Sequence, residues 1–281
     1  MAIRSRTLVA VALAAFASGV LAQETTDDWD ATVDAERRLT AAQLEFSNGL
    51  GIAVRCVGGR YDALIGGLPP AAEGVETRVL TLRFGEDSPF EQRWNVTRNP
   101  NLAVSELPAP FARALRRGGS LQVMLPGAGE GGRNLRYVLD LPPSSAAIDR
   151  TLEACDRPLV DPRDAEIQPV DGSLPEGIQW ERPPQVEFPS RNRYESGFAV
   201  ISCLTRPDGR LRECVVESEH PIDGGFGQAT LASTEGARVR NAADRAGALP
   251  VRRIIYRTNF RDGAVGADAY IAPSSRLRRQ P

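Results

Sequence analysis

Four cysteines are the residues of this chain whose chemistry is best defined by the sequence. They form an even set in a chain of 281 residues, at Cys56, Cys155, Cys203 and Cys214. An even number of cysteines is typical of disulfide bonding in an exported protein. A zinc site is disfavoured, because no Cys-x-x-Cys motif occurs and His220 is the single histidine. We therefore expect two disulfides, and neither a bound metal nor a cofactor.

The pairing of these cysteines follows from a predicted hairpin. The chain alternates between apolar and polar residues on both sides of Asp208-Gly209, a turn signal. A two- or four-residue loop centred there places Cys203 directly opposite Cys214, whereas a three-residue loop with a bulge shifts the register by one residue. The first register favours a bridge within the hairpin and leaves the other two cysteines for each other. We interpret both bridges as structural, because a redox-active pair is usually closely spaced with a lowered thiol pKa.

Other residues that could do chemistry lack the partners that catalysis needs. The glycine-rich run at residues 127–132 joins two predicted strands with no helix after it, which indicates a hairpin tip and not a phosphate-binding loop. His220 has no serine or cysteine nucleophile motif nearby, and all 34 basic residues are arginines, so no lysine is available. The acidic cluster Asp161, Asp164 and Glu166 is typical of solvated charge, with loose cation binding as the alternative. We therefore expect no catalytic residue and no enzymatic activity.

The N-terminus has the pattern of an export signal. Arg4 and Arg6 precede an apolar stretch at residues 7–20, and short side chains lead to a cleavage point between Ala22 and Gln23. About 14 apolar residues suit a signal peptide, whereas a membrane span needs about 20. An uncleaved anchor is the alternative. The sequence predicts a periplasmic protein with no stable membrane span, and its net charge of −2 gives no nucleic-acid footprint.

Composition and hydrophobic periodicity divide the chain into segments. The fold class that they predict is α+β with two small domains, one mostly antiparallel β with helices at 108–117 and 142–154, and one of order ββαβ with its helix at 226–239. The segments are a signal peptide (1–22), an acidic segment (23–36), a β-rich α+β domain (37–157), a Pro-rich linker (158–177), a second α+β domain (178–262) and a disordered tail (263–281).

The second domain shows an ordered series of motifs. A Pro-aromatic approach ends at Phe188-Pro189, a turn contains Asp208-Gly209, a helix begins at Phe226, and a strand closes at Phe260. In this order, residues 180–262 resemble the C-terminal domain of TonB-family energy transducers. The resemblance implies a sheet edge that accepts an extended peptide by strand addition. In place of that family's anchor and long spacer stand the cleavable signal and the linker at 158–177, which favours binding over energy transduction.

The first domain has a fainter resemblance. Its pattern is a strand ending in Cys56, Trp94 before a short helix, a hairpin at residues 121–141 and a helix ending in Cys155. This order is similar to periplasmic accessory proteins associated with type VI secretion. The similarity implies no activity.

These observations predict a periplasmic, non-catalytic binding or scaffold protein. Its TonB-like module would bind an extended segment of an envelope protein, such as an outer-membrane receptor or a secretion component. The alternatives are a TonB-type transducer for outer-membrane transport and a structural envelope protein without a peptide ligand. We expect Ile255→Pro to abolish docking. The predicted docking edge is the closing strand, with Arg252, Arg253, Ile254, Ile255, Tyr256, Arg257, Thr258, Asn259 and Phe260.

Overall fold

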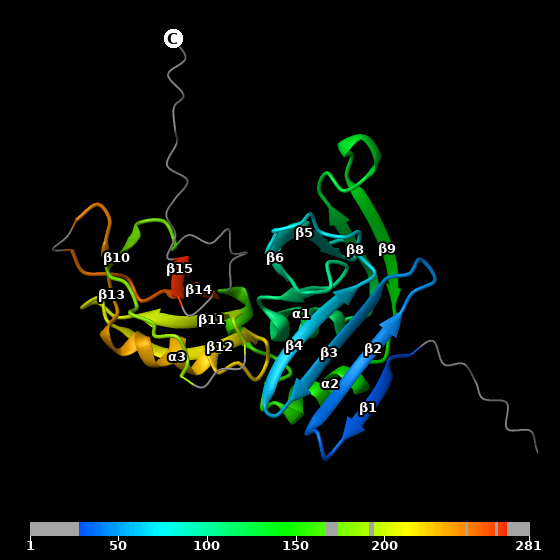
Figure 1. The fold of residues 1–281 in the computed structure, drawn as a ribbon, viewed down its shortest axis with the longest axis horizontal. Coiled ribbons are helices and arrows are strands. Elements are labelled where there is room, and N and C mark those ends of the chain that lie inside the picture. Colours follow the sequence, from blue (N-terminus) through cyan, green and yellow to red (C-terminus); the bar gives the residue numbers. More distant parts are fainter. Residues whose placement is uncertain (1–27, 167–173, 191–193, 245–246, 262–263, 269–281) are drawn as a thin grey trace, which may run out of the picture.

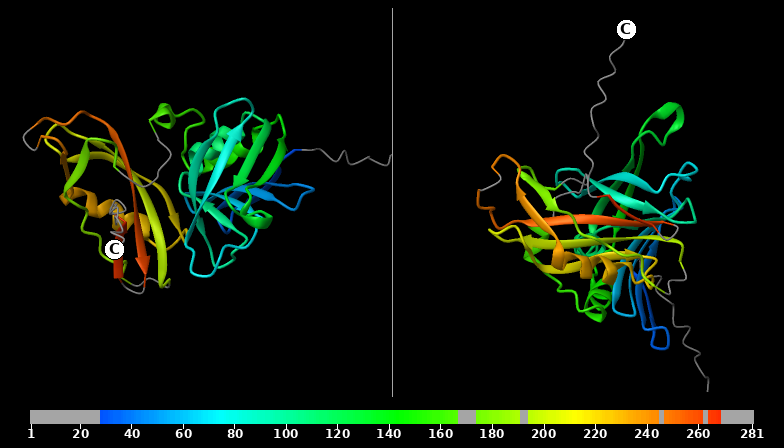
Figure 2. Two further views of the ribbon diagram at one scale, coloured as in Figure 1. Left: turned by 90° about the horizontal axis from the view of Figure 1, so that it is seen from above. Right: turned by 60° about the vertical axis from the view of Figure 1, so that its left-hand side comes forward.

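The chain folds into three antiparallel sheets and three α-helices within the part that the structure describes, which supports an α+β or mostly β fold. The structure is a computed structural model, and it describes residues 28–166, 174–190, 194–244, 247–261 and 264–268. Two lobes lie side by side (Figures 1 and 2). We call residues 28–166 the N-terminal lobe and residues 174–268 the C-terminal lobe.

The N-terminal lobe is built on one nine-stranded sheet. The strand order is β1-β2-β3-β4-β7-β6-β5-β8-β9, and all neighbouring pairs are antiparallel. The strands are β1 (Asp30–Asp34), β2 (Leu39–Glu45), β3 (Gly51–Val57), β4 (Arg60–Gly66), β5 (Thr77–Phe84), β6 (Phe90–Val96), β7 (Ala103–Ser105), β8 (Gly119–Leu125) and β9 (Leu135–Leu141).

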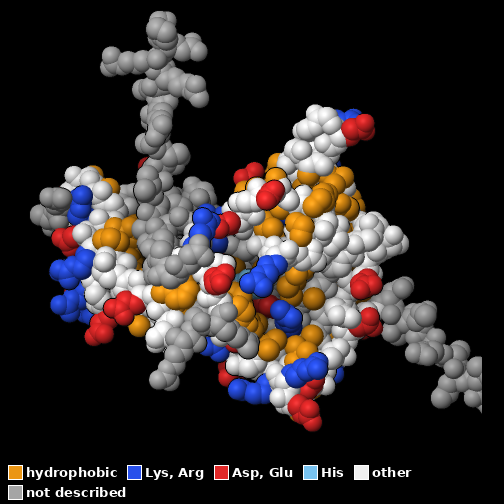
Figure 3. Space-filling model, viewed as in Figure 1, with side chains coloured by type: hydrophobic (Ala, Val, Ile, Leu, Met, Phe, Trp, Pro, Cys, Tyr) orange, Lys and Arg blue, Asp and Glu red, His pale blue; other side chains and the backbone are white. Residues whose placement is uncertain are grey.

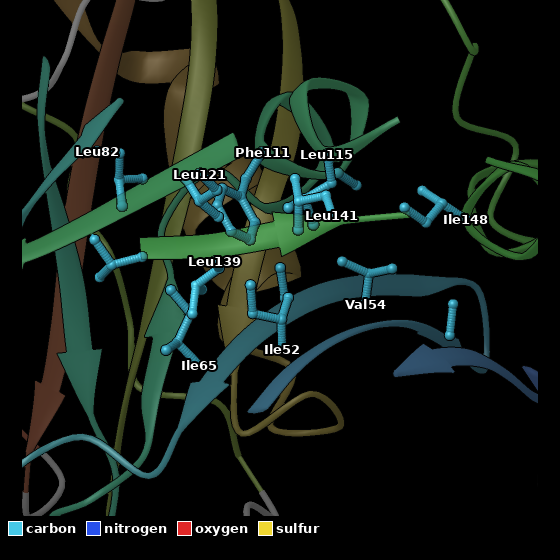
Figure 4. Packing of buried hydrophobic residues seen from close by; sticks show 14 of the residues in the cluster. Ile52, Val54, Ile65, Leu82, Phe111, Leu115, Leu121, Leu139, Leu141 and Ile148 are labelled. Carbon is cyan, nitrogen blue, oxygen red and sulfur yellow. The ribbon is translucent and has the colours of Figure 1, made fainter. Parts of the chain in front are cut away.

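A single apolar core fills this lobe. Strand β3 alternates between half-buried and buried residues, so Ile52, Val54 and Cys56 point inward. They join side chains of β8 and β9, and Figure 4 shows Ile52 lying below Leu139. The helices α1 (Pro108–Leu115) and α2 (Ala146–Ala154) close the core, and a disulfide between Cys56 and Cys155 ties β3 to the end of α2.

The C-terminal lobe is built on a four-stranded sheet of order β12-β11-β14-β15. Helix α3 packs against β11 and β12, and a two-stranded sheet of β10 and β13 lies beside them. The elements are β10 (Ile178–Arg182), β11 (Ser196–Thr205), β12 (Leu211–His220), α3 (Phe226–Ser233), β13 (Arg238–Asn241), β14 (Arg253–Arg261) and β15 (Ala264–Asp268).

Strand β11 buries both of its faces. On one face, Ala199 packs with Phe226 of α3 and Phe260 of β14, whose ring centroids lie 4.5 Å apart. On the other face, Phe198 and Val200 pack against the N-terminal lobe. A strand that is covered on both faces has a nearly continuous apolar sequence, and the run FAVISCL has this character apart from Ser202.

The predicted disulfide pairing is confirmed, and the hairpin combines both registers that the sequence left open. Near the turn, Thr205 pairs with Leu211, which is the register shifted by one residue. A bulge in β12, where Glu213 has φ of +50°, then restores the unshifted register. This places the Cα atoms of Cys203 and Cys214 4.1 Å apart, and the two residues form a disulfide.

Several predicted boundaries differ from the structure. Strand β1 lies within the acidic segment 23–36, because the buried Trp29 anchors it beside β2. The helix predicted at 226–239 ends at Ser233, and Val239 lies in β13, where it pairs with Trp180. The tail predicted from residue 263 contains β15. The signal peptide at 1–22 and residues 269–281 lie outside the described residues.

Candidate functional site

Strand β14 holds the predicted docking edge, and it has a neighbour on each side. Its whole length pairs with β11, from Ser196↔Arg261 to Leu204↔Arg253. Its outer side pairs with β15 from Arg257 to Arg261. The edge prediction is therefore wrong for this half of the strand. Between Arg253 and Tyr256, no strand in the described part of the chain pairs with the outer side.

The direction of the backbone groups identifies which residues could accept a new strand. The Thr205 N–H donates to the Arg252 carbonyl at 2.9 Å, so the backbone of Arg252 faces β11. Hydrogen-bonding groups of successive residues in an antiparallel strand point to opposite sides. Arg253 and Ile255 therefore direct their N–H and C=O groups to the outer side of β14.

The side chains of this strand have other roles than the sequence suggested. Ile255 is 7% exposed and packs against Leu64 and Leu107 of the N-terminal lobe. Arg257 is 5% exposed, so it does not protect an edge as an arginine on an open strand would. Ile255→Pro would disturb the contact between the lobes, and it is not a clean test of docking.

We call the contact between the lobes the seam, and it contains a buried charge cluster. Glu106 is 2% exposed and lies 2.9 Å from Nε of Arg93 and 3.2 Å from Nε of Arg257. Arg257 also donates to the Asn95 side chain, and its guanidinium lies 5.0 Å from the centre of the Phe198 ring. Burial raises the pKa of Glu106, and the two guanidinium groups oppose that shift. The cluster joins β6, the start of α1, β14 and β11.

Strand β12 adds three consecutive buried polar residues to the seam. Glu217 accepts hydrogen bonds from Ser202 and from Arg163, and Ser218 donates to the Glu106 carbonyl at 2.7 Å. Glu219 pairs with Arg60 of β4 and accepts from the Gly227 N–H at 2.7 Å, in the first turn of α3. A carboxylate at this position satisfies an amide that has no partner within the helix. Burial raises the pKa of Glu219.

The acidic cluster of the predicted linker is paired rather than simply solvated. The Arg113 guanidinium donates to Asp164 at 2.7 Å, and Asp161 accepts from Arg163 at 2.6 Å. Glu166 pairs with Arg253 at the start of β14, at 2.9 Å. The first part of the linker thus packs on both lobes, and residues 167–173 lie outside the described residues.

The remaining residues considered in the sequence fall into separate places. The run at 127–132 lies in the loop between β8 and β9, as the sequence predicted. His220 ends β12, where its ring lies 6.1 Å from the Phe198 ring, and burial lowers its pKa. In the described part of the chain, no helix is long and apolar enough to cross a membrane.

The sequence did not reveal the charged residues of the seam. Glu217 and Glu219 are each followed by another polar residue in β12, and this pattern is normally that of a solvated face. Glu106 precedes α1 with no visible partner. A signal was present in the run FAVISCL of β11, which is apolar except for Ser202 and indicates a strand covered on both faces and therefore a second packing surface.

Comparison with protein-family models, with curated protein sequences and with solved structures finds no match to this chain.

Proposed function

We propose that this chain is a non-catalytic envelope protein that binds an extended segment of another envelope protein by strand addition to the outer side of β14. The observation that carries the proposal is the arrangement at that side. The five-residue β15 covers Arg257–Arg261 only, and Arg253–Tyr256 have no described strand beside them. The two disulfides fit a protein that folds in an oxidising compartment.

The opposite edge of the sheet is less suited to strand addition. Strand β12 contains two bulges, and bulges twist an edge away from pairing. The guanidinium of Arg157 also donates to the Val216 carbonyl of that strand at 2.8 Å. These features favour β14 as the strand that accepts a partner.

The resemblance to the TonB C-terminal domain supports the same proposal. Three residues of the quoted motifs, Phe188, Phe226 and Phe260, meet in one aromatic cluster, with Phe188 5.9 Å and 5.8 Å from the other two ring centroids. The approach segment, the helix start and the closing strand therefore pack together as one unit. In this proposal the two lobes are separate α+β domains, and the mature periplasmic protein begins near Gln23.

Backbone groups would supply most of the affinity. A partner strand would lie end to end with β15, next to the uncovered part of β14. It would bond to the outward N–H and C=O groups of Arg253 and Ile255. Arg252, at the start of this stretch, is exposed. Its charge favours a partner segment that carries acidic residues.

A proline substitution tests the proposal at the backbone. Arg253→Pro removes an outward N–H and leaves the bonds to β11 in place, whereas Arg253→Ala removes the same ion pair with Glu166 but keeps the N–H. The mature protein and both variants are crosslinked in a periplasmic extract, and the captured proteins are identified by mass spectrometry. A partner that is captured by the wild type and by Arg253→Ala, but lost with Arg253→Pro, supports strand addition. Equal capture by all three proteins contradicts it.

A shortened chain provides a defined probe. A variant that ends at Arg261 lacks β15, so the outer side of β14 is open from Arg253 to Arg261. A synthetic peptide with the sequence of residues 262–272 should bind this variant and should bind the full mature chain much more weakly, as measured by isothermal titration calorimetry. The control peptide has the same composition in scrambled order. Absence of binding to the shortened chain, with its fold confirmed by circular dichroism, would show that this side does not accept a strand.

A further inference from the structure

The two lobes enclose a cleft of about 820 Å³ at one end of the seam. The seam is closed where Ile255 packs against Leu107, and it opens toward the start of β11 and the ends of β6 and β14. Figure 3 shows hydrophobic and basic side chains beside each other over the middle of the molecule, where the lobes meet. The volume lies in the range of small-molecule sites.

Positive charge predominates around this cleft. Arg55, Arg98, Arg257 and Arg261 line it, whereas Glu76 is the one acidic residue among its described lining residues. Three of the arginines are paired, with Asp62, Glu106 and Glu76. Arg98 is exposed and forms no hydrogen bond or ion pair with a described residue. The arrangement favours an anion over a cation or a neutral ligand.

Apolar groups line the inner part of the cleft. Leu64 and Leu102 come from the N-terminal lobe, and Phe198 comes from β11. The ring of His220 lies nearly parallel to the Phe198 ring, with an angle of 24° between their planes. Because burial lowers the pKa of His220, this ring is neutral at pH 7 and adds no charge. A flat apolar group would lose its hydration here and contact these side chains.

We propose that this cleft binds a small organic anion whose acidic group faces the arginines and whose ring-sized apolar body contacts Leu64, Leu102 and Phe198. The site differs from the strand-addition side of β14, because side chains form it and both lobes contribute. It therefore does not depend on the proposed binding of a partner strand. Arg98 would move onto the acidic group, and Arg257 would lie at the inner end of the cleft.

The test uses 2-naphthoate as the probe, with 2-naphthalenemethanol as its neutral counterpart of similar shape. Isothermal titration calorimetry on the mature chain should show saturable binding of 2-naphthoate with one site per chain. The neutral compound should bind roughly tenfold more weakly, which is the loss expected for one contact with a charged donor. Absence of saturable binding of 2-naphthoate, or equal affinity for the two compounds, would overturn the proposal.

Matched variants locate the binding. Arg98→Ala should weaken 2-naphthoate roughly tenfold, and Leu102→Trp should block the cleft. Arg133→Ala is the control, because Arg133 lies on the β8–β9 hairpin and bonds only locally, to the Glu130 carbonyl. Arg98 is exposed, so its variant should keep the melting temperature of the wild type. An unchanged affinity in both Arg98→Ala and Leu102→Trp would place the probe elsewhere and contradict the assignment.

Discussion

The two lobes bury their sheets in different ways. The N-terminal lobe closes its nine-stranded sheet around one apolar core, with two helices and a disulfide completing it. The C-terminal lobe divides its buried apolar residues among smaller clusters, and one of these includes Leu64, Val104 and Leu107 of the other lobe. The N-terminal lobe therefore buries the inner face of its sheet with its own residues. The C-terminal lobe needs the N-terminal lobe to cover one face of its sheet.

This difference bears on which surface of the C-terminal lobe the proposed partner strand would use. One face of its sheet is covered by α3, and the other lies on the N-terminal lobe. The outer side of β14 at Arg253–Tyr256 has no strand beside it among the described residues. A small lobe that is supported on both faces would present this side without rearranging, which would lower the entropic cost of the proposed binding.

Removal of a disulfide should change the free energy of unfolding most, and the two disulfides should differ in this respect. Cys56–Cys155 closes a loop of 99 residues and Cys203–Cys214 a loop of 11. In the chain-entropy model these loops are worth about 4.7 and about 2.8 kcal/mol. The double serine variant of the first pair should therefore lose more free energy of unfolding than that of the second, as measured by urea denaturation. A larger loss for the short loop would contradict the order that loop length predicts for the two bridges.

Glu106→Gln should weaken the seam itself. The variant leaves the buried guanidinium of Arg257 and the half-buried guanidinium of Arg93 without their carboxylate, at a cost of about 3 kcal/mol. Unfolding followed by fluorescence and by circular dichroism should show the loss, with the C-terminal lobe unfolding first. The control is Glu76→Gln, which breaks the exposed pair with Arg261 and should cost less than about 1 kcal/mol. Equal effects would mean that the seam charges are not coupled to folding.

Substitution of Gly209 tests a close backbone contact inside the C-terminal lobe. Gly209 has φ of +80°, and a Cβ there would lie 2.2 Å from the Val239 carbonyl oxygen. Gly209→Ala should therefore lower the free energy of unfolding by more than about 1 kcal/mol. Gly132→Ala is the control, because its φ is +77° but a Cβ there meets no atom within 4 Å. A similar loss of stability in both variants would mean that the positive φ alone causes it, and that the close contact with Val239 adds nothing.

The smallest effect is the pH dependence due to His220. Burial lowers the pKa of this histidine, so the folded state binds a proton less readily than the unfolded state. Its contribution to stability is present above the ordinary histidine pKa of about 6.5, and it is lost as the pH falls through the lowered value. Since it is the single histidine of the chain, His220→Gln should reduce the loss of stability between pH 7 and pH 5. An unchanged pH profile would show that the ring is already solvated.

The sequence predicted those parts of the fold that have a local signal. The hairpin predicted at residues 121–141 corresponds to β8 and β9, and the hairpin around Asp208-Gly209 led to the correct pairing of Cys203 with Cys214. The end of α3 could not be predicted, because Val239 leaves the helical pattern only through its pairing with Trp180. Likewise, the sequence of β1 shows no buried face, since its position depends on β2.

The candidate site was predicted only in part. The closing strand was placed correctly, but its position between β11 and β15 depends on a five-residue strand rich in Ala and Gly, which has weak β propensity. The burial of Arg257 could not be predicted from the sequence either, because its partner Glu106 lies in the other lobe. Contacts between distant segments leave no periodic pattern in either one.

Hydrogen exchange along β14 distinguishes an open outer side from one that is already covered. If the outer side between Arg253 and Tyr256 is open, the amides of Arg253 and Ile255 should exchange faster than those of Ile254 and Tyr256, which point toward β11. Addition of a bound partner strand should then slow the first pair and leave the second unchanged. Equal protection of all four amides in the free protein would show that this side is already covered, and it would contradict strand addition at β14.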